Sequence, residues 1–174
     1  HFGLAGPVDR APFSISDAPS SPLQLIGLIP GSENNPAKRW PVAHWRTLIE
    51  SLPGERFVLF GTANDSPIAT AIAGGFDRER IENVTGQTDL SAFARRLGSC
   101  RLLVSNDTGG MHLANALGVP LIALFGPTNP MRTGPVFSAR GLPGSQAPVR
   151  TLQPPGCPPT GGGSLANLLP PVVA

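Results

Sequence analysis

Cysteine and long apolar runs are both scarce in this sequence. Its two cysteines, Cys100 and Cys157, form no CxxC motif and no Cys/His cluster, which argues against a zinc site and against a disulfide framework. The lack of a disulfide framework is typical of a reducing compartment. No apolar run approaches the ~20 residues that a membrane-spanning helix needs, and no signal peptide is recognisable. We therefore expect a cytoplasmic protein.

Clustered charge of one sign is also missing. The formal net charge is only +2, and no Lys/Arg-rich run occurs, so we expect no nucleic-acid partner. The slight basic excess is compatible with an anionic ligand or a membrane surface, and equally with an ordinary soluble surface. The sequence has no G-x-G-x-x-G after an expected strand and no G-K-[ST], which argues against a standard dinucleotide fold and a P-loop.

Proline and glycine, by contrast, are abundant at 21 residues each, and they concentrate near the two ends of the chain. We predict a linker or disordered start over residues 1–22, a folded domain over 23–130, and a Pro/Gly-rich tail over 131–174 with a short helix near Ser164. The chain does not begin with Met, and we expect it to be part of a longer protein.

Within the folded stretch, short apolar runs alternate with segments of helical periodicity. Continuous apolar runs of this length are typical of strands buried on both faces of a parallel sheet. The expected strands span residues 23–29, 56–60, 81–84, 101–105 and 120–125, and the expected helices 41–52, 67–74, 89–98 and 109–117. Asp89 can cap the third helix, and Gly118 can end the fourth. This alternation predicts an α/β fold, a Rossmann-like parallel sheet with helices on both faces.

Small and hydroxyl-bearing residues follow every expected strand. Ligands of open α/β sheets bind beyond the carboxyl ends of the strands, where these loops meet. One such loop is weak evidence, because turns are made of the same residues. Five on one edge indicate a ligand site. The loops are residues 30–32, 61–65, 85–88, 106–110 and 126–129.

The fourth loop, which runs into a helix, carries the sharpest signal. A helix start exposes unpaired amides and a partial positive charge, and glycines allow a phosphate to approach the backbone. We expect Thr108 and Gly109 to bind phosphate through amide or hydroxyl groups. A carboxylate repels phosphate, so Asp107 would shape the turn or bind a sugar hydroxyl. The alternative is that Asp107 or Thr108 only caps the helix and the glycines serve packing.

Three further residues have two readings each. Lys38 suits phosphate as a mobile charge, or it forms with Arg39 a solvated pair at a loop end. Asp65 can hold two ribose hydroxyls, or cap the following helix. His112 can donate a hydrogen bond to the ligand as a neutral imidazole, or be structural. No nucleophile–base or carboxylate pair at suggestive spacing lies beside His112, so we assign no catalytic base.

Several stretches together resemble a known family. Pro30-Gly31-Ser32 with Ala37-Lys38-Arg39-Trp40-Pro41, then Val58 to Asp65, then Ser105 to Ala114, and finally Phe125-Gly126-Pro127-Thr128 resemble the glycosyltransferase family of the ADP-heptose:lipopolysaccharide heptosyltransferases. The likeness covers roughly residues 23–130. The combination is far more specific than any single piece.

The resemblance implies one half of a GT-B enzyme, in which two Rossmann-like domains face a cleft. This chain matches the C-terminal domain, which holds the nucleotide-sugar donor, whereas the missing N-terminal domain holds the acceptor and the catalytic carboxylate. Because the catalytic carboxylate lies in the missing domain, no catalytic residue is expected in this chain. The family needs no metal, so no cofactor is expected either. The implied contacts are Ser32 and Lys38 to the pyrophosphate or sugar, Asp65 to ribose, Thr88 to adenine, Thr108 and Gly109 to phosphate, and Asp107 and His112 to the sugar and the cleft.

These expectations give one leading hypothesis and two alternatives. The leading one is an ADP-heptose donor-binding domain for lipopolysaccharide core synthesis, inactive alone, meeting a lipopolysaccharide-type acceptor through the missing domain, with peripheral inner-membrane contact left open. The alternatives are a non-catalytic nucleotide-binding module and a GT-B-like nucleotide-sugar epimerase, which should prefer a UDP-sugar. One departure from the family is that Cys157-Pro158 is only a remnant of a Cys-rich segment.

Overall fold

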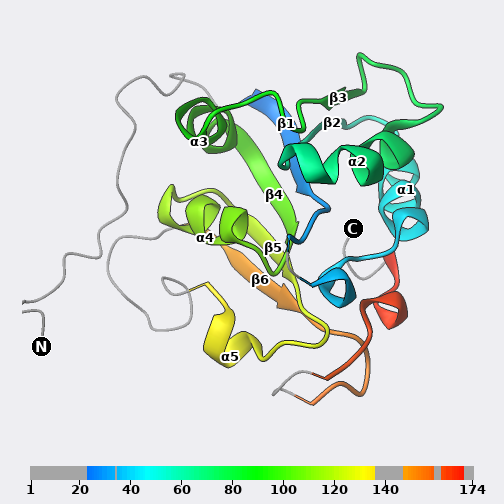
Figure 1. The fold of residues 1–174 in the computed structure, drawn as a ribbon, viewed down its shortest axis with the longest axis vertical. Coiled ribbons are helices and arrows are strands. Elements are labelled where there is room, and N and C mark those ends of the chain that lie inside the picture. The colour runs from blue at the N-terminus through cyan, green and yellow to red at the C-terminus, as the bar shows by residue number, and fades with distance from the viewer. Residues whose placement is uncertain (1–22, 34, 136–146, 159–161, 171–174) are drawn as a thin grey trace, which may run out of the picture.

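A single parallel sheet organises the chain in a computed structural model that describes residues 23–33, 35–135, 147–158 and 162–170. The sheet has six strands in the order β3-β2-β1-β4-β5-β6 (Figure 1). The strands are β1 (Leu23–Ile29), β2 (Arg56–Leu59), β3 (Ile81–Asn83), β4 (Cys100–Asn106), β5 (Leu121–Leu124) and β6 (Val149–Leu152). All neighbouring pairs are parallel. The predicted Rossmann-like α/β fold is confirmed.

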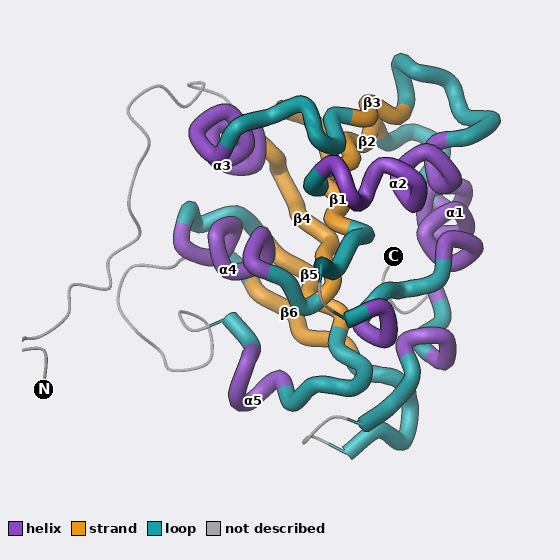
Figure 2. The backbone as a smooth tube through the Cα atoms, in the orientation of Figure 1, coloured by secondary structure: helices purple, strands orange, loops and turns teal. Residues whose placement is uncertain are grey.

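Helices cover both faces of this sheet, as Figure 2 shows. They are α1 (Val42–Ser51), α2 (Ser66–Ala73), α3 (Leu90–Gly98), α4 (Gly109–Ala116) and α5 (Pro130–Thr133), with 3-10 turns η1 (Pro36–Lys38), η2 (Ala63–Asp65) and η3 (Leu165–Asn167). One core cluster joins α1, α2 and η3 to the sheet, and a second joins α3 and α4 to it. No helix in the described ranges is long and apolar enough to cross a membrane.

The predicted helix boundaries agree closely with the structure because their end signals are local. The Asp89 side chain caps α3 by accepting a hydrogen bond from the Ala92 amide at 2.7 Å. Gly118 ends α4 with φ +73°, a conformation that only glycine adopts without strain. The four helices that the sequence predicted are therefore all present, each displaced by no more than a residue or two.

The tail predicted for residues 131–174 is in part wrong. β6 extends the sheet beside β5, and Leu165 and Leu168 are buried in the core. The Trp40 indole donates to the Leu168 carbonyl at 2.7 Å, which ties this late segment to the start of α1. The predicted short helix near Ser164 is η3, a single 3-10 turn. The predicted start, residues 1–22, and the remainder of the tail lie outside the described residues.

Two adjacent leucines allow a test of whether the late segment supports the fold. Leu168 is fully buried and Leu169 is 57% exposed. We expect Leu168→Ala to lower the free energy of unfolding by about 2 kcal/mol or more, because it leaves a cavity in the core. Leu169→Ala should change it by less than about 0.5 kcal/mol. Urea denaturation of both variants measures the difference, and equal effects would mean that the segment only lies on the surface.

Candidate functional site

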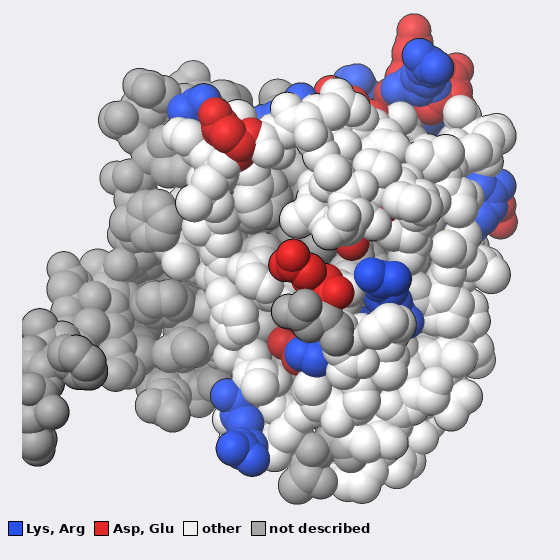
Figure 3. All heavy atoms as spheres, in the orientation of Figure 1, with Lys and Arg blue, Asp and Glu red and all other residues white. Residues whose placement is uncertain are grey.

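One pocket of about 710 Å³ opens at the carboxyl ends of β1 to β4. The pocket lies at the predicted edge of the sheet, where the helices that follow β1 and β4 pack on opposite faces. In Figure 3, acidic and basic side chains meet around the centre of this face, while most of the surface nearby is uncharged. The predicted site residues that line the pocket are Ser32, Lys38, Asp65, Thr88, Asp107, Thr108 and Gly109.

Two predicted contributions lie outside the lining. His112 is exposed on α4 and is not among the pocket-lining residues, so its contact with a ligand stays a prediction. The loop after β5 does not line the pocket either. It reaches the site indirectly, because Thr128 donates a hydrogen bond to the pocket residue Asp107.

The start of α4 is open toward the pocket. Thr108 is the N-cap residue, yet its side chain makes no capping hydrogen bond. The first amides of any α-helix lack partners within the helix, so they remain available to an anion. A Cβ added to Gly109 would meet nothing within 4 Å, whereas one added to Gly110 would collide with Ile29 Cδ1. Gly109 thus leaves room for a ligand, and the packing alternative holds for Gly110 alone.

Lys38 and Asp107 form an ion pair at 2.8 Å in the pocket wall. Their side chains are 23% and 6% exposed, so the pair is largely shielded from water. The solvated-pair alternative is therefore wrong for Lys38. It is wrong for Arg39 as well, because that guanidinium donates to the Ser32 carbonyl at 3.2 and 2.9 Å and anchors the loop after β1.

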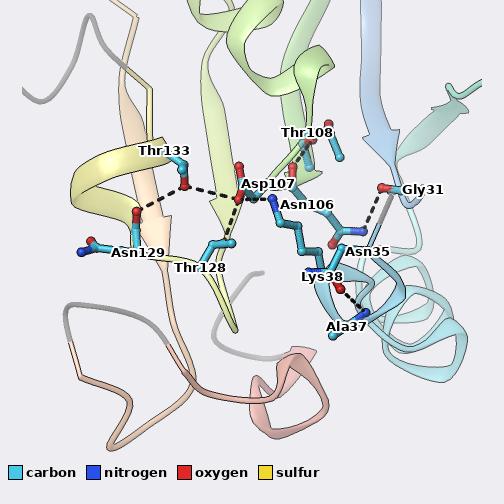
Figure 4. A network of polar contacts seen from close by, with 11 residues as sticks. Gly31, Asn35, Ala37, Lys38, Asn106, Asp107, Thr108, Thr128, Asn129 and Thr133 are labelled. Atoms are coloured by element: carbon cyan, nitrogen blue, oxygen red, sulfur yellow. Dashed lines mark hydrogen bonds and ion pairs between the residues drawn. The ribbon is translucent and has the colours of Figure 1, made fainter. Parts of the chain in front are cut away.

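The loops around Lys38 are held by a residue that the sequence analysis did not single out. Asn106 is fully buried at the end of β4. Its Oδ1 accepts from the Trp40 amide at 3.3 Å, and its Nδ2 donates to the Pro30 carbonyl at 2.8 Å. The same Nδ2 also donates to the Gly31 carbonyl at 3.4 Å (Figure 4). The signal for this role is an amide side chain at the end of a largely buried strand, where an unpaired polar group would be costly.

The two carboxylate oxygens of Asp65 have different surroundings. The side chain makes no capping hydrogen bond to the following helix α2, so that predicted alternative is wrong, and the ribose contact stays a prediction. Oδ2 accepts from the Thr62 amide at 2.9 Å and from the Thr62 hydroxyl at 3.0 Å, which closes a capping box around η2. Oδ1 is buried and has no hydrogen-bond partner among the described residues. A Cβ on Gly31 would collide with this carboxylate, so Gly31 lets it pack against the loop after β1. An unpaired buried carboxylate oxygen is a strong acceptor for a ligand hydroxyl.

The far wall of the pocket is more apolar. Thr88 lies here beside Leu90 and Phe93 at the start of α3. Leu90 is 75% exposed, an unusual state for a large apolar side chain, and Phe93 stacks edge-on against Phe60 at 5.4 Å between ring centroids. The predicted adenine contact at Thr88 stays a prediction.

The cysteines take no part in the pocket. Burial raises the pKa of the Cys100 thiol to about 12, although Arg96 opposes the shift, so that thiol is protonated near neutrality. Cys157 is also free. Across the described part of the chain, no three His, Cys, Asp or Glu side chains gather into a group that could hold a metal ion.

The chain is similar in sequence to a known protein family and to curated proteins. Residues 9–147 match glycosyltransferase family 9 (heptosyltransferase). Lipooligosaccharide heptosyltransferase 2 of Haemophilus influenzae is 42% identical over 117 residues, which cover 64% of this chain and 34% of that protein. This chain thus spans about a third of that curated relative.

Solved structures agree with the sequence comparison. The ADP-heptose lipopolysaccharide heptosyltransferase II of Escherichia coli is 34% identical, with a TM-score of 0.72 over 91% of this chain and 46% of that one. An E. coli heptosyltransferase solved with ADP is 28% identical, with a TM-score of 0.71 over 90% of this chain and 44% of that one. Fold, motifs and relatives coincide, and the chain therefore belongs to glycosyltransferase family 9, the heptosyltransferase family.

Proposed function

We propose that this chain is the donor-binding domain of a heptosyltransferase of lipopolysaccharide core synthesis, and that its pocket binds ADP-heptose. The observation that carries the proposal is the pocket lining, which combines an open helix start at Gly109 with Lys38 and two carboxylates, Asp65 and Asp107. The relatives support this choice, since one is an ADP-heptose heptosyltransferase and another was solved with ADP. Family membership also argues against the epimerase alternative.

The charged and polar side chains that line the pocket suit the groups of a nucleotide sugar. The pyrophosphate would lie against the amides at the start of α4, with Lys38 as its counter-charge. Oδ1 of Asp65 would accept from the ribose hydroxyls, and Oδ1 of Asp107 from a hydroxyl of the transferred sugar. Thr88 and Leu90 would flank the adenine. Carboxylates suit the hydroxyl-rich ends of such a donor, because they would repel its anionic centre.

Transfer needs groups that this pocket does not supply. We propose that a second domain provides the lipopolysaccharide-type acceptor site and the catalytic carboxylate, and that it brings the enzyme to the cytoplasmic face of the inner membrane. The 174-residue chain should then bind donor without transferring it. We also propose that no metal is required, since Lys38 and the helix amides meet the pyrophosphate charge; ADP should bind equally well in Mg²⁺ and in EDTA.

The ribose contact can be tested at Asp65. Asp65→Ala should weaken the binding of ADP by about 1.5–3 kcal/mol, as expected for a hydrogen bond to a charged group. The binding of 2′,3′-dideoxy-ADP should change little. The variant also loses the capping box, so we expect its free energy of unfolding to fall by about 1 kcal/mol. Calorimetry below the unfolding transition separates the two effects. Equal losses for both nucleotides would leave Asp65 with its capping role only.

A ligand panel tests the function as a whole. Isothermal titration of the chain with ADP-heptose, ADP, UDP and UDP-N-acetylglucosamine should rank the adenine nucleotides first. ADP-heptose should bind more tightly than ADP, because the sugar adds contacts at Asp107. A preference for the UDP-sugar would support the epimerase alternative instead, and binding of ADP without any gain from heptose would support a nucleotide-binding module.

A further inference from the structure

The two carboxylate oxygens of Asp107 differ in the hydrogen bonds that they accept. Oδ2 is the acceptor for Lys38 Nζ at 2.8 Å, Thr128 Oγ1 at 2.7 Å and Thr133 Oγ1 at 3.3 Å (Figure 4). Oδ1 accepts no hydrogen bond from a described residue, although the side chain lines the pocket. Three donors on one oxygen leave the other as the only acceptor that this carboxylate can offer to a ligand.

The three donors come from three separate parts of the chain. Lys38 ends η1, Thr128 follows β5 and Thr133 ends α5. The sheet register explains the approach of Thr128: Asn106 and Leu124 are paired across β4 and β5, so the loops that follow these strands start side by side. Asn129 then caps α5 by accepting from the Met131 amide at 2.8 Å, which turns Thr133 back toward Asp107.

We propose that Thr128 and Thr133 are positioning residues that fix the rotamer of Asp107, so that Oδ1 faces the sugar of the donor. This inference rests on the proposed function, in which Asp107 contacts the sugar. Without the two hydroxyls, Lys38 alone would hold Oδ2, and the same lysine is needed by the pyrophosphate. The threonines thus keep the carboxylate in place when the lysine is shared with the ligand, and α5 becomes part of the donor site without touching the donor.

The two threonines do not contribute equally. A hydroxyl carries one proton, and the Thr133 hydroxyl also lies 3.2 Å from the Asn129 carbonyl, a competing acceptor. Among the described residues, the Thr128 hydroxyl bonds to Asp107 alone, at the shorter distance of 2.7 Å. Thr128 should therefore hold the carboxylate more firmly than Thr133.

Replacing Thr by Val removes the hydroxyl and keeps the shape, and replacing Thr by Ser keeps the hydroxyl. We expect Thr128→Val to lower the affinity for ADP-heptose by about three- to tenfold, which is the size of one lost hydrogen bond. The affinity for ADP should change by less than about twofold. Thr133→Val should have a smaller effect of the same kind, and Thr128→Ser should bind ADP-heptose nearly as well as the unaltered chain.

Two measurements on the 174-residue chain decide the proposal. Titration calorimetry gives the ratio of ADP-heptose to ADP affinity, and three-bond proton couplings give the Asp107 side-chain rotamer without ligand. The proposal predicts one rotamer in the unaltered chain and several in Thr128→Val/Thr133→Val, with a fall in the ratio. A single rotamer in the double variant, or equal weakening of both ligands, would overturn it. Failure of the unaltered chain to bind ADP would refute the proposed function, while the couplings would still decide the positioning role.

Discussion

Gly109→Val should abolish the binding of ADP and ADP-heptose, raising both dissociation constants about a hundredfold or more, while the domain stays folded. The valine side chain would occupy the space at the start of α4 that a phosphate needs in order to reach the backbone amides. The effect should be independent of salt, because it acts through volume and not through charge.

The fold should tolerate this change for two reasons. A Cβ at Gly109 meets nothing within 4 Å, and Gly109 is not among the glycines with positive φ, so a side chain there causes neither a clash nor backbone strain. Gly54→Val is a matched control, since Gly54 has the same two properties in the turn after α1, away from the pocket. Circular dichroism confirms folding, and calorimetry gives the affinities. If the folded Gly109→Val variant bound ADP normally, the pyrophosphate could not lie at the start of this helix.

Lys38→Ala should weaken ADP by about ten- to a hundredfold and adenosine hardly at all. Two effects combine in this loss. The pyrophosphate loses a cation, and the Asp107 carboxylate, 6% exposed, loses its counter-charge while it lies near the phosphates. The loss should shrink as salt rises, though less than for an exposed lysine, because Lys38 is only 23% exposed.

The effect of the unpaired Asp107 carboxylate can be isolated by removing the charges of both Lys38 and Asp107. Lys38→Ala/Asp107→Asn should bind ADP several times more tightly than Lys38→Ala, since the repelling carboxylate is gone. Asp107→Asn alone should weaken ADP-heptose more than ADP. Titrations with ADP and adenosine at two salt concentrations complete the cycle. If Lys38→Ala weakens adenosine as much as ADP, the lysine does not contact phosphate.

The sequence predicted those parts of the fold whose signals are local. β1, β2, β4 and β5 are mostly apolar runs between turn residues, and Asp89 and Gly118 mark helix ends through their own side chain or backbone. β6 lacks such a signal: its two central residues are exposed, it lies at the sheet edge, and prolines flank it at 148 and 154. Its pairing with β5 is a long-range contact that no local window of sequence contains.

The candidate site divides in the same way. Residues directly after strands could be assigned to the pocket because parallel topology brings those loops together. The separate roles of the residues within the site could not be predicted. Gly109 and Gly110 are identical in sequence terms, yet only the first is open to a ligand. The partners of Asp107 at positions 38, 128 and 133 depend on how η1 and α5 pack, which sequence periodicity does not report.

The location of the pyrophosphate is the central claim, and amide nitrogen–proton correlation spectra of the chain during an ADP titration test it most directly. The account predicts that the amides of Thr108, Gly109 and Gly110 shift most, that those of the loops after β1 and β2 follow, and that adenosine leaves the α4 amides nearly unchanged. Largest shifts outside the loops that line the pocket, or α4 amides that respond to adenosine as strongly as to ADP, would contradict it.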